Sequence, residues 1–213
     1  MTRHKTMTND SATARRILAA AEHHFAAQGM AGARTEEIAV AARANKAMLY
    51  YYFGDKRRLH RAVLENLFRQ LRVGVYAPAA RSTQSPHRRL LEFITSYFDF
   101  LASHPNYPRL VQREAMGATK DFEWIVQEHL RPSHNRLVRT LEEGIRAGEF
   151  RNVDTHQTAF TIMGMTTSYF AAAPILSHVA GHNLMAPKAL IARKRSLLDF
   201  LNHGLLRTKV RSR

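Results

Sequence analysis

The chain has 213 residues, 45% of them hydrophobic, which is enough to form a sizeable core in one large or two small domains. It contains no cysteine, so disulfides and thiolate zinc sites are excluded. The net charge of +15 favours a polyanionic partner, with nucleic acid first and an anionic membrane second.

We expect neither a membrane-spanning segment nor a signal peptide in this chain. No run approaches the roughly 18 apolar residues of a membrane span, and the basic N-terminus has no apolar segment behind it, as a signal peptide would. We therefore expect a cytoplasmic protein without a membrane partner. Charge does not locate a nucleic-acid site, because residues 1–76 carry +7 (13 basic, 6 acidic) and residues 77–213 carry +8 (19 basic, 11 acidic).

The N-terminal third predicts four helices in close succession, over residues 13–28, 35–42, 45–53 and 56–76. Gly29 and Gly54 are expected to end the first and the third. Thr35, Asn45 and Asp55 are the expected N-caps of the others, because their side-chain oxygens can accept from a free backbone N–H.

Helical periodicity resumes after a break at residues 77–85. The predicted helices cover residues 87–103, a short segment ending at 116, 120–130, 132–147, 154–176 and 188–206, with a loop at 177–187. No segment alternates as a strand does, so we predict an all-α protein of about nine or ten helices. We divide it into an N-terminal domain, residues 1–62, and a larger helical domain, residues 63–213.

Residues 35–56 have the pattern of a helix-turn-helix unit, in which the second of two short helices can enter a DNA major groove. That second helix carries Tyr50, Tyr51 and Tyr52 in succession. They could be ordinary core residues. However, consecutive positions on a helix differ by about 100°, so three in a row cannot all face one core. We expect at least one of them to be exposed for contact with a partner.

The same stretch resembles the DNA-binding domain of TetR-type transcriptional regulators, closely over about residues 13–62. The matching residues are Phe25, Gly29, Thr35, Ile38, Ala39, Ala42, Lys46, Ala47, residues 49–53, Lys56 and Leu59. Further on, residues 143–150 look like a connection common late in such chains. The chain departs from the family at Arg43, where glycine is usual because the turn favours a left-handed backbone.

The resemblance implies roles in DNA binding for nine residues. Contacts to phosphates are implied for Thr35, Tyr50, Tyr52 and Lys56, and contacts to base edges for Lys46, Ala47, Met48 and Tyr51. Asn45 would cap the helix and also touch DNA. Lysine can donate to guanine and apolar groups can meet thymine methyls, which agrees with these roles. Arg3 and Lys5 allow a minor-groove arm, although a solvated tail is the simpler interpretation.

The resemblance also implies a homodimer that pairs through its last two long helices, and hence a palindromic operator on double-stranded DNA. The candidate interface residues are Gly164 and Ala171, which permit close helix contact, and Ile191, Leu198, Leu201 and Leu205, which recur at heptad-like spacing. An apolar stripe of this kind is also compatible with burial inside one protomer.

The middle helices would enclose a cavity for a small-molecule effector that the sequence does not identify. The candidate lining residues are Tyr97, Phe98, Leu101, Arg113, Met116, Trp124, His129, Met163, Tyr169 and Phe170. Aromatic and methionine side chains suit an adaptable apolar pocket. For any one of them, a place in the core is the simpler interpretation.

The sequence thus predicts a ligand-responsive DNA-binding transcriptional regulator, namely a repressor that a small-molecule effector releases from its operator. The alternatives are a constitutive DNA-binding regulator and, with less support, a helical metal-binding protein or enzyme. His178 and His182 have the i, i+4 spacing of helical metal ligands, but they lie in or beside a predicted loop with no carboxylate. We expect no cofactor, no resident metal and no enzymatic activity.

Overall fold

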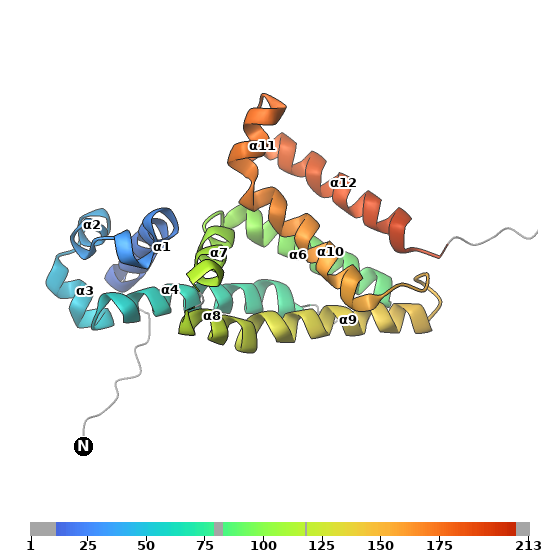
Figure 1. The fold of residues 1–213 in the computed structure, drawn as a ribbon, viewed down its shortest axis with the longest axis horizontal. Coiled ribbons are helices and arrows are strands. Elements are labelled where there is room, and N and C mark those ends of the chain that lie inside the picture. Colours follow the sequence, from blue (N-terminus) through green and yellow to red (C-terminus); the bar gives the residue numbers. More distant parts are fainter. Residues whose placement is uncertain (1–11, 79–82, 118, 208–213) are drawn as a thin grey trace, which may run out of the picture.

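The computed structural model describes residues 12–78, 83–117 and 119–207, and nearly all of them are helical. Within these ranges the one strand-like pairing is an isolated bridge between Phe150 and Leu206. The all-α prediction is confirmed. Figure 1 shows a small N-terminal group of helices joined to a larger C-terminal group by one long helix, α4. The suggested arm residues Arg3 and Lys5 lie outside the described residues.

The N-terminal group consists of α1 (Ala12–Gly32), α2 (Thr35–Ala41) and α3 (Lys46–Phe53). Their inward side chains, among them Ile17, Phe25 and Leu49, are fully buried. The predicted stop at Gly29 is a bend within α1, where φ is +73°, a left-handed conformation that glycine adopts without strain. This bend redirects the chain toward α2.

Two of the three predicted N-caps are confirmed. Asn45 accepts a hydrogen bond from the backbone N–H of Met48 at 2.8 Å, and Asp55 accepts one in the first turn of α4 at 2.7 Å. The prediction for Thr35 is wrong, because extended Arg34 occupies the N-cap position of α2 and makes no side-chain cap bond. Thr35 is the first helical residue instead, and its side chain is buried.

Helix α4 (Lys56–Leu71) runs from α3 into the C-terminal group and continues without a break into the π-helical segment η1 (Arg72–Tyr76). The predicted division between residues 62 and 63 therefore falls inside α4. A hydrophobic cluster extends continuously from α1 to the last helix. The two groups of helices thus share both a helix and a core.

The C-terminal group comprises α6 (Pro86–Ser103), α7 (Tyr107–Gly117), α8 (Lys120–Ile125), the π-helical η2 (Val126–Leu130), α9 (Arg131–Arg146), α10 (Thr155–Ala171), α11 (Ala173–Ala180) and α12 (Pro187–Leu205). Helix α6 lies at its centre and contacts η1, α9, α10 and α12. Its apolar face, which includes Leu90, Ile94 and Leu101, is fully buried.

Two predicted breaks differ in the structure. The helices expected on either side of Pro132 form one run from α8 through η2 into α9, and Pro132 lies in the first turn of α9, directly after the π-helical η2. The helix expected to reach Leu176 ends at Ala171, and α11 leaves it at 73°. Pro174 explains this bend, because it cannot donate within the helix and clashes with the preceding turn. Gly181 (φ +70°) then ends α11.

Among the described residues, no single helix is both long enough and apolar enough to cross a membrane. Helices α10 and α11 meet the test only as a pair, by length and composition, across their 73° bend.

The connection from α9 to α10 is tied to the end of α12. The N–H of Arg151 donates to the carbonyl of Leu205 at 2.9 Å, and the N–H of Arg207 donates to the carbonyl of Glu149 at 3.1 Å. Phe150, between them, is buried against Gly144 of α9. This segment therefore holds the ends of three helices together.

Candidate functional site

Helix α3 presents one buried and one exposed face. Leu49 and Phe53 are buried in the core, whereas Tyr51 is 75%, Tyr50 40% and Met48 36% exposed. The expectation that at least one of the three tyrosines is exposed is confirmed. Lys46, Ala47 and Asn45 are also exposed, and Tyr52 is half-buried. Most of the predicted DNA-contacting side chains thus lie together on the solvent side of one short helix.

The turn between α2 and α3 has a left-handed backbone at Arg43, a conformation that costs energy for any residue other than glycine. Arg43 has φ +52° and is the one non-glycine residue with positive φ among the described residues. The expectation of a left-handed backbone there is confirmed. Arg16 of α1 supports the turn, because its Nε donates to the carbonyl of Ala42 at 3.0 Å. Sequence reasoning missed Arg16, since its partner lies 26 residues away.

The two predicted DNA-binding lysines already have partners in the protein. Lys46 forms an ion pair with Glu36 of α2, and its ammonium lies 5.8 Å from the centre of the Tyr50 ring. Lys56 donates to the carbonyl of Ala31 at 3.0 Å. A phosphate or base would therefore replace or share existing contacts of these ammonium groups.

The Glu36–Lys46 pair shifts both partners toward their charged forms. Its hydrogen bond from Lys46 lowers the pKa of the Glu36 carboxyl to about 2. The same carboxylate raises the pKa of Lys46. Glu36 is therefore ionised at neutral pH.

Thr35, predicted to contact a phosphate, is buried and its hydroxyl is directed to the carboxylate of Glu36 at 3.3 Å. A contact from this position would come from a backbone N–H in the first turn of α2, where the helix dipole favours anions. The DNA contacts of all nine predicted residues stay predictions.

Helix α7 holds the C-terminal group against α1. Arg113 donates to the carbonyls of Ala26 (3.1 Å) and Ala27 (2.7 Å), which lie just before the bend in α1. Asn106 donates to Glu22 of α1 at 3.1 Å. Arg113 was a candidate for effector binding, but in this structure its guanidinium fixes the N-terminal helices to the C-terminal ones.

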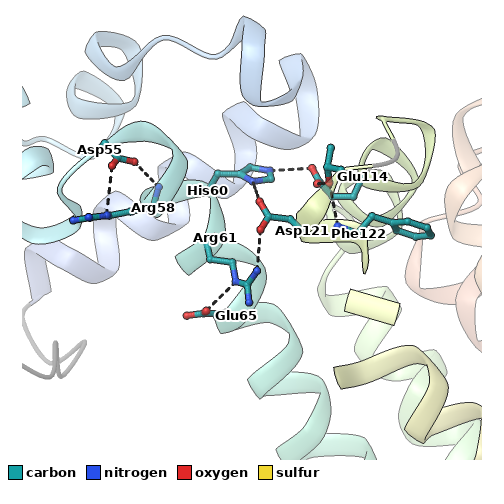
Figure 2. Close-up of polar contacts among 9 residues, drawn as sticks. Asp55, Arg58, His60, Arg61, Glu65, Glu114, Asp121 and Phe122 are labelled. Carbon is teal, nitrogen blue, oxygen red and sulfur yellow. Dashed lines mark hydrogen bonds and ion pairs between the residues drawn. The ribbon is translucent and has the colours of Figure 1, made fainter. Parts of the chain in front are cut away.

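A buried polar cluster lies where α4 meets α7 and α8 (Figure 2). The Nε2 atom of His60 is 3.4 Å from Oε1 of Glu114, and its Nδ1 is 3.9 Å from Oδ2 of Asp121. Asp121 also accepts from Arg61 at 2.8 Å, and the Arg61 guanidinium lies 3.4 Å from the centre of the Trp124 ring. These contacts join α4 to α7 and α8 of the C-terminal group.

His60 in this cluster is 2% exposed. Burial lowers its pKa, against the opposing effect of the Glu114 and Asp121 carboxylates. The imidazole is therefore neutral at neutral pH. Sequence reasoning missed the cluster, because its members come from three helices and share no spacing pattern.

Some of the predicted effector-binding residues lie together: Phe98 packs against Tyr169 and Phe170, and Trp124 packs against His129. Five lie in the shared core, namely Tyr97, Phe98, Leu101, Tyr169 and Phe170. Three are half-buried, namely Trp124, His129 and Met163. Met116 is 86% exposed, and Arg113 faces α1 as described above. A common role in effector binding stays a prediction.

The predicted dimer residues fall into three groups. Gly164 and Ile191 are exposed, Ala171 and Leu198 are half-buried, and Leu201 and Leu205 lie in the protomer's own core. The outward face of α10 also exposes Phe160, one helical turn before Gly164. An apolar, close-approach surface is thus present on α10, whereas Leu201 and Leu205 already pack within the protomer. The dimer interface itself stays a prediction.

The histidine pair lacks the helical geometry that its spacing suggested. His178 lies near the end of α11, and Gly181 ends that helix before His182. Each ring Nδ1 is hydrogen-bonded to a local backbone carbonyl, of Pro174 and Ala180 respectively. In the part of the chain that the structure describes, no group of three or more His, Cys, Asp or Glu side chains has an arrangement that could hold a metal ion.

Two family models match the chain. The model for bacterial regulatory proteins of the tetR family matches residues 17–63, and the model for the tetracyclin repressor-like C-terminal domain matches residues 86–201, more than half of the chain. With the geometry of α2 and α3, these matches define a helix-turn-helix regulator. The chain belongs to the TetR family of transcriptional regulators.

Individual relatives agree with this family. The HTH-type transcriptional repressor SCO4008 of Streptomyces coelicolor is 38% identical over 140 residues, 64% of this chain and 67% of that protein. The HTH-type transcriptional repressor NicS of Pseudomonas putida is 28% identical over 137 residues, 64% of this chain and 63% of NicS, so the match spans less than two thirds of NicS.

A solved structure has a similar fold. AibR, in complex with isovaleryl coenzyme A and operator DNA, matches with a TM-score of 0.74 and 17% identity, over 89% of this chain and 97% of that one. At this identity the likeness is one of fold alone.

Proposed function

We propose that this protein is a homodimeric repressor that binds a palindromic operator through α3 and releases it when a small-molecule effector binds the C-terminal helices. The observation that carries the proposal is the solvent-facing surface of α3, a capped helix that exposes aromatic, small and basic side chains. The repressors SCO4008 and NicS are relatives, which supports repression over activation. Its place of action would be the cytoplasm, where the operator of a bacterial regulator lies.

The proposed DNA contact follows from the size and chemistry of α3. The major groove is about 12 Å wide and admits one helix. Tyr51 and Met48 would meet base edges, and Lys46 would donate to a guanine once it leaves Glu36. Phosphates on either side would be held by Tyr50 of α3 and by Lys56, the first residue of α4. A symmetric dimer would place two such helices a helical turn, or a multiple of it, apart on the DNA.

The proposed response to an effector relies on α4. This helix belongs to both groups, and its His60 and Arg61 contact α7 and α8. An effector that binds one arrangement of the C-terminal helices better than another would shift the population of the molecule toward that arrangement. Helix α4 would carry the shift to α3 and change the spacing of the two recognition helices. AibR, which shares the fold, was crystallised with both a coenzyme A ester and operator DNA.

The decisive experiment begins with selection of duplexes from a random pool by the full-length protein. We expect a palindromic site, and we expect Tyr51→Ala to weaken binding to it by about tenfold or more, the range for loss of a base contact. Val73→Ala is the matched control, because Val73 is similarly exposed but lies on η1. Anisotropy of the labelled site measures both affinities. Equal affinities for Tyr51→Ala and the wild type would refute the assigned role of α3.

A further inference from the structure

A cleft of about 320 Å³ lies between α6 and α9, a size within the range of small-molecule sites. Its lining residues are Arg89, Leu90, Phe93, Pro132, Ser133, Arg136, Leu137, Arg139, Thr140 and Glu143. None of the ten residues predicted from the sequence to bind an effector is among them. The cleft is therefore a site that the sequence reasoning did not anticipate.

Three arginines and one glutamate give this cleft a formal charge of +2. Arg89 forms an ion pair with Glu143, but its buried Nε has no hydrogen-bond partner among the described residues. The Nη1 of Arg136 donates to the carbonyl of Tyr76 at 2.7 Å, which leaves its other N–H groups available. Arg139 is exposed, and no hydrogen bond or ion pair joins it to another described residue. The arginines of the cleft thus have N–H groups that are not hydrogen-bonded to acceptors of the protein.

The other walls of the cleft are apolar or already satisfied. Leu90, Phe93 and Leu137 line the cleft with the small exposed parts of core side chains, since each is at most 7% exposed. The hydroxyls of Ser133 and Thr140 donate back to carbonyls one turn earlier in the helix. The remaining polar chemistry is that of guanidinium groups, which recognise carboxylates and phosphates. A positive rim beside an apolar wall suits a ligand with an anionic head and a hydrocarbon tail.

The cleft is also far from the DNA-reading helix. Figure 1 shows α6 and α9 extending to the end of the molecule opposite α3. These arginines are therefore not part of the surface by which α3 of the same protomer would meet its operator.

We propose that the α6–α9 cleft binds a small amphiphilic anion, whose carboxylate or phosphate head pairs with Arg136 and Arg139 and whose hydrocarbon tail packs on Leu90 and Phe93. The bond from Arg136 to the Tyr76 carbonyl connects this cleft to η1, the continuation of α4. A head group that draws Arg136 away releases the end of α4. Only the claim that this anion is the effector rests on the proposed function; the binding site stands independently.

Calorimetric titration of the full-length protein tests the site with four probes. Octanoate and octyl phosphate carry the two possible heads, octanol lacks the charge, and inorganic phosphate lacks the tail. We expect at least one of the two amphiphilic anions to saturate one site per protomer. Octanol should bind about tenfold more weakly or worse, because a charge-assisted hydrogen bond is lost. Inorganic phosphate should also bind about tenfold more weakly or worse, because it has no hydrocarbon tail to bury. A preference between octanoate and octyl phosphate identifies the head group. Absence of saturable binding by both anions overturns the site, as does equal affinity for octanol.

Three variants locate the binding. Arg139→Gln should weaken binding of the anion by about tenfold, because a charge-assisted contact is lost. Glu143→Gln should tighten binding of the anion, because it removes the carboxylate that competes with the anion for the arginines of the cleft. Arg146→Gln is the control, since Arg146 is an exposed arginine of the same helix outside the cleft. Equal losses in Arg139→Gln and Arg146→Gln, or weaker binding in Glu143→Gln, would place the anion elsewhere.

Operator affinity is measured separately with and without the bound anion. Binding without any change in operator affinity keeps the site but removes its role as the effector site. Release of the operator by a different compound, with no binding of these anions, removes the site but leaves the proposed repressor standing.

Discussion

At the scale of single residues, the exposed surface of α3 that we propose to face DNA has part of its positive charge neutralised by a carboxylate of the same protein. Lys46 is the basic residue at the start of this helix, and Glu36 of the preceding helix holds it. The arrangement keeps Lys46 charged and oriented, but it requires an exchange of partners when DNA binds. Glu36 is therefore expected to moderate operator affinity rather than to increase it.

Replacing Glu36 with glutamine tests this competition. Glu36→Gln should tighten operator binding by about two- to fivefold, the effect typical of one exposed ion pair, because Lys46 becomes free to meet DNA. The matched control is Glu37→Gln, which removes the same charge from the same turn but from a carboxylate paired with His24. Anisotropy at one fixed salt concentration compares them, because salt changes every such affinity. An equal gain in both variants would show a general charge effect instead of release of Lys46.

At the scale of elements, the connection after α9 depends on Gly144. The backbone of Gly144 is helical, so the position needs glycine for its small size and not for its backbone conformation. Gly144 lies inside α9, and a Cβ atom placed on it would be 2.1 Å from Cδ2 of the Phe150 ring. Phe150 is fixed by its neighbours, whose backbones bond to the end of α12. The glycine is needed for close packing between an aromatic ring and a helix.

The substitution Gly144→Ala should therefore destabilise the protein, by about 1–3 kcal/mol from overpacking, reduced by up to about 1 kcal/mol because alanine favours the helix. Gly204→Ala is the control with the opposite sign, because Gly204 is helical in α12 and an added Cβ there meets nothing within 4 Å. That variant should gain about 0.5–1 kcal/mol. Urea unfolding at one protomer concentration measures both. A stable Gly144→Ala would mean that Phe150 has another place to pack.

At the scale of the whole molecule, the proposed dimer would have to present two α3 helices to one operator. The outward face of α10 has the character of a contact surface: Phe160 and Gly164 lie one turn apart on it, and both are exposed. The outer side of Gly164 is open, since an added Cβ there meets nothing within 4 Å. A large side chain at this position is therefore tolerated by the protomer and obstructs only a partner.

The variant Gly164→Arg should fold normally and dissociate into monomers, with a large loss of operator affinity. Gly74→Arg is its control, because Gly74 is also exposed with open space around it but lies on η1. Sedimentation gives the mass of each variant, and circular dichroism gives its helical content. A Gly164→Arg protein that remains a dimer would move the interface away from this face of α10.

Local features of the chain were readable from the sequence. The helical periodicity, the caps Asn45 and Asp55, and the left-handed turn at Arg43 each depend on residues close together in the chain, which is why a pattern in the sequence reveals them. The exposure of at least one of Tyr50, Tyr51 and Tyr52 followed from helix geometry alone. Thr35 was misplaced by one position because a capping hydroxyl and a first-turn hydroxyl look the same in a sequence.

Only the tertiary structure decided which distant side chains meet. Arg113 is a link to α1 rather than a lining residue of the α6–α9 cleft, the His60 cluster joins three helices, and Arg89, Arg136 and Arg139 come together although nearly fifty residues separate the first two. Apolar periodicity says that a residue faces inward, but packing decides whether it meets its own core, a ligand or a partner. The sequence by itself therefore determined the helix-turn-helix pattern of a TetR-family regulator. The three-dimensional arrangement decided where its charges converge, because long-range contacts carry no local signature.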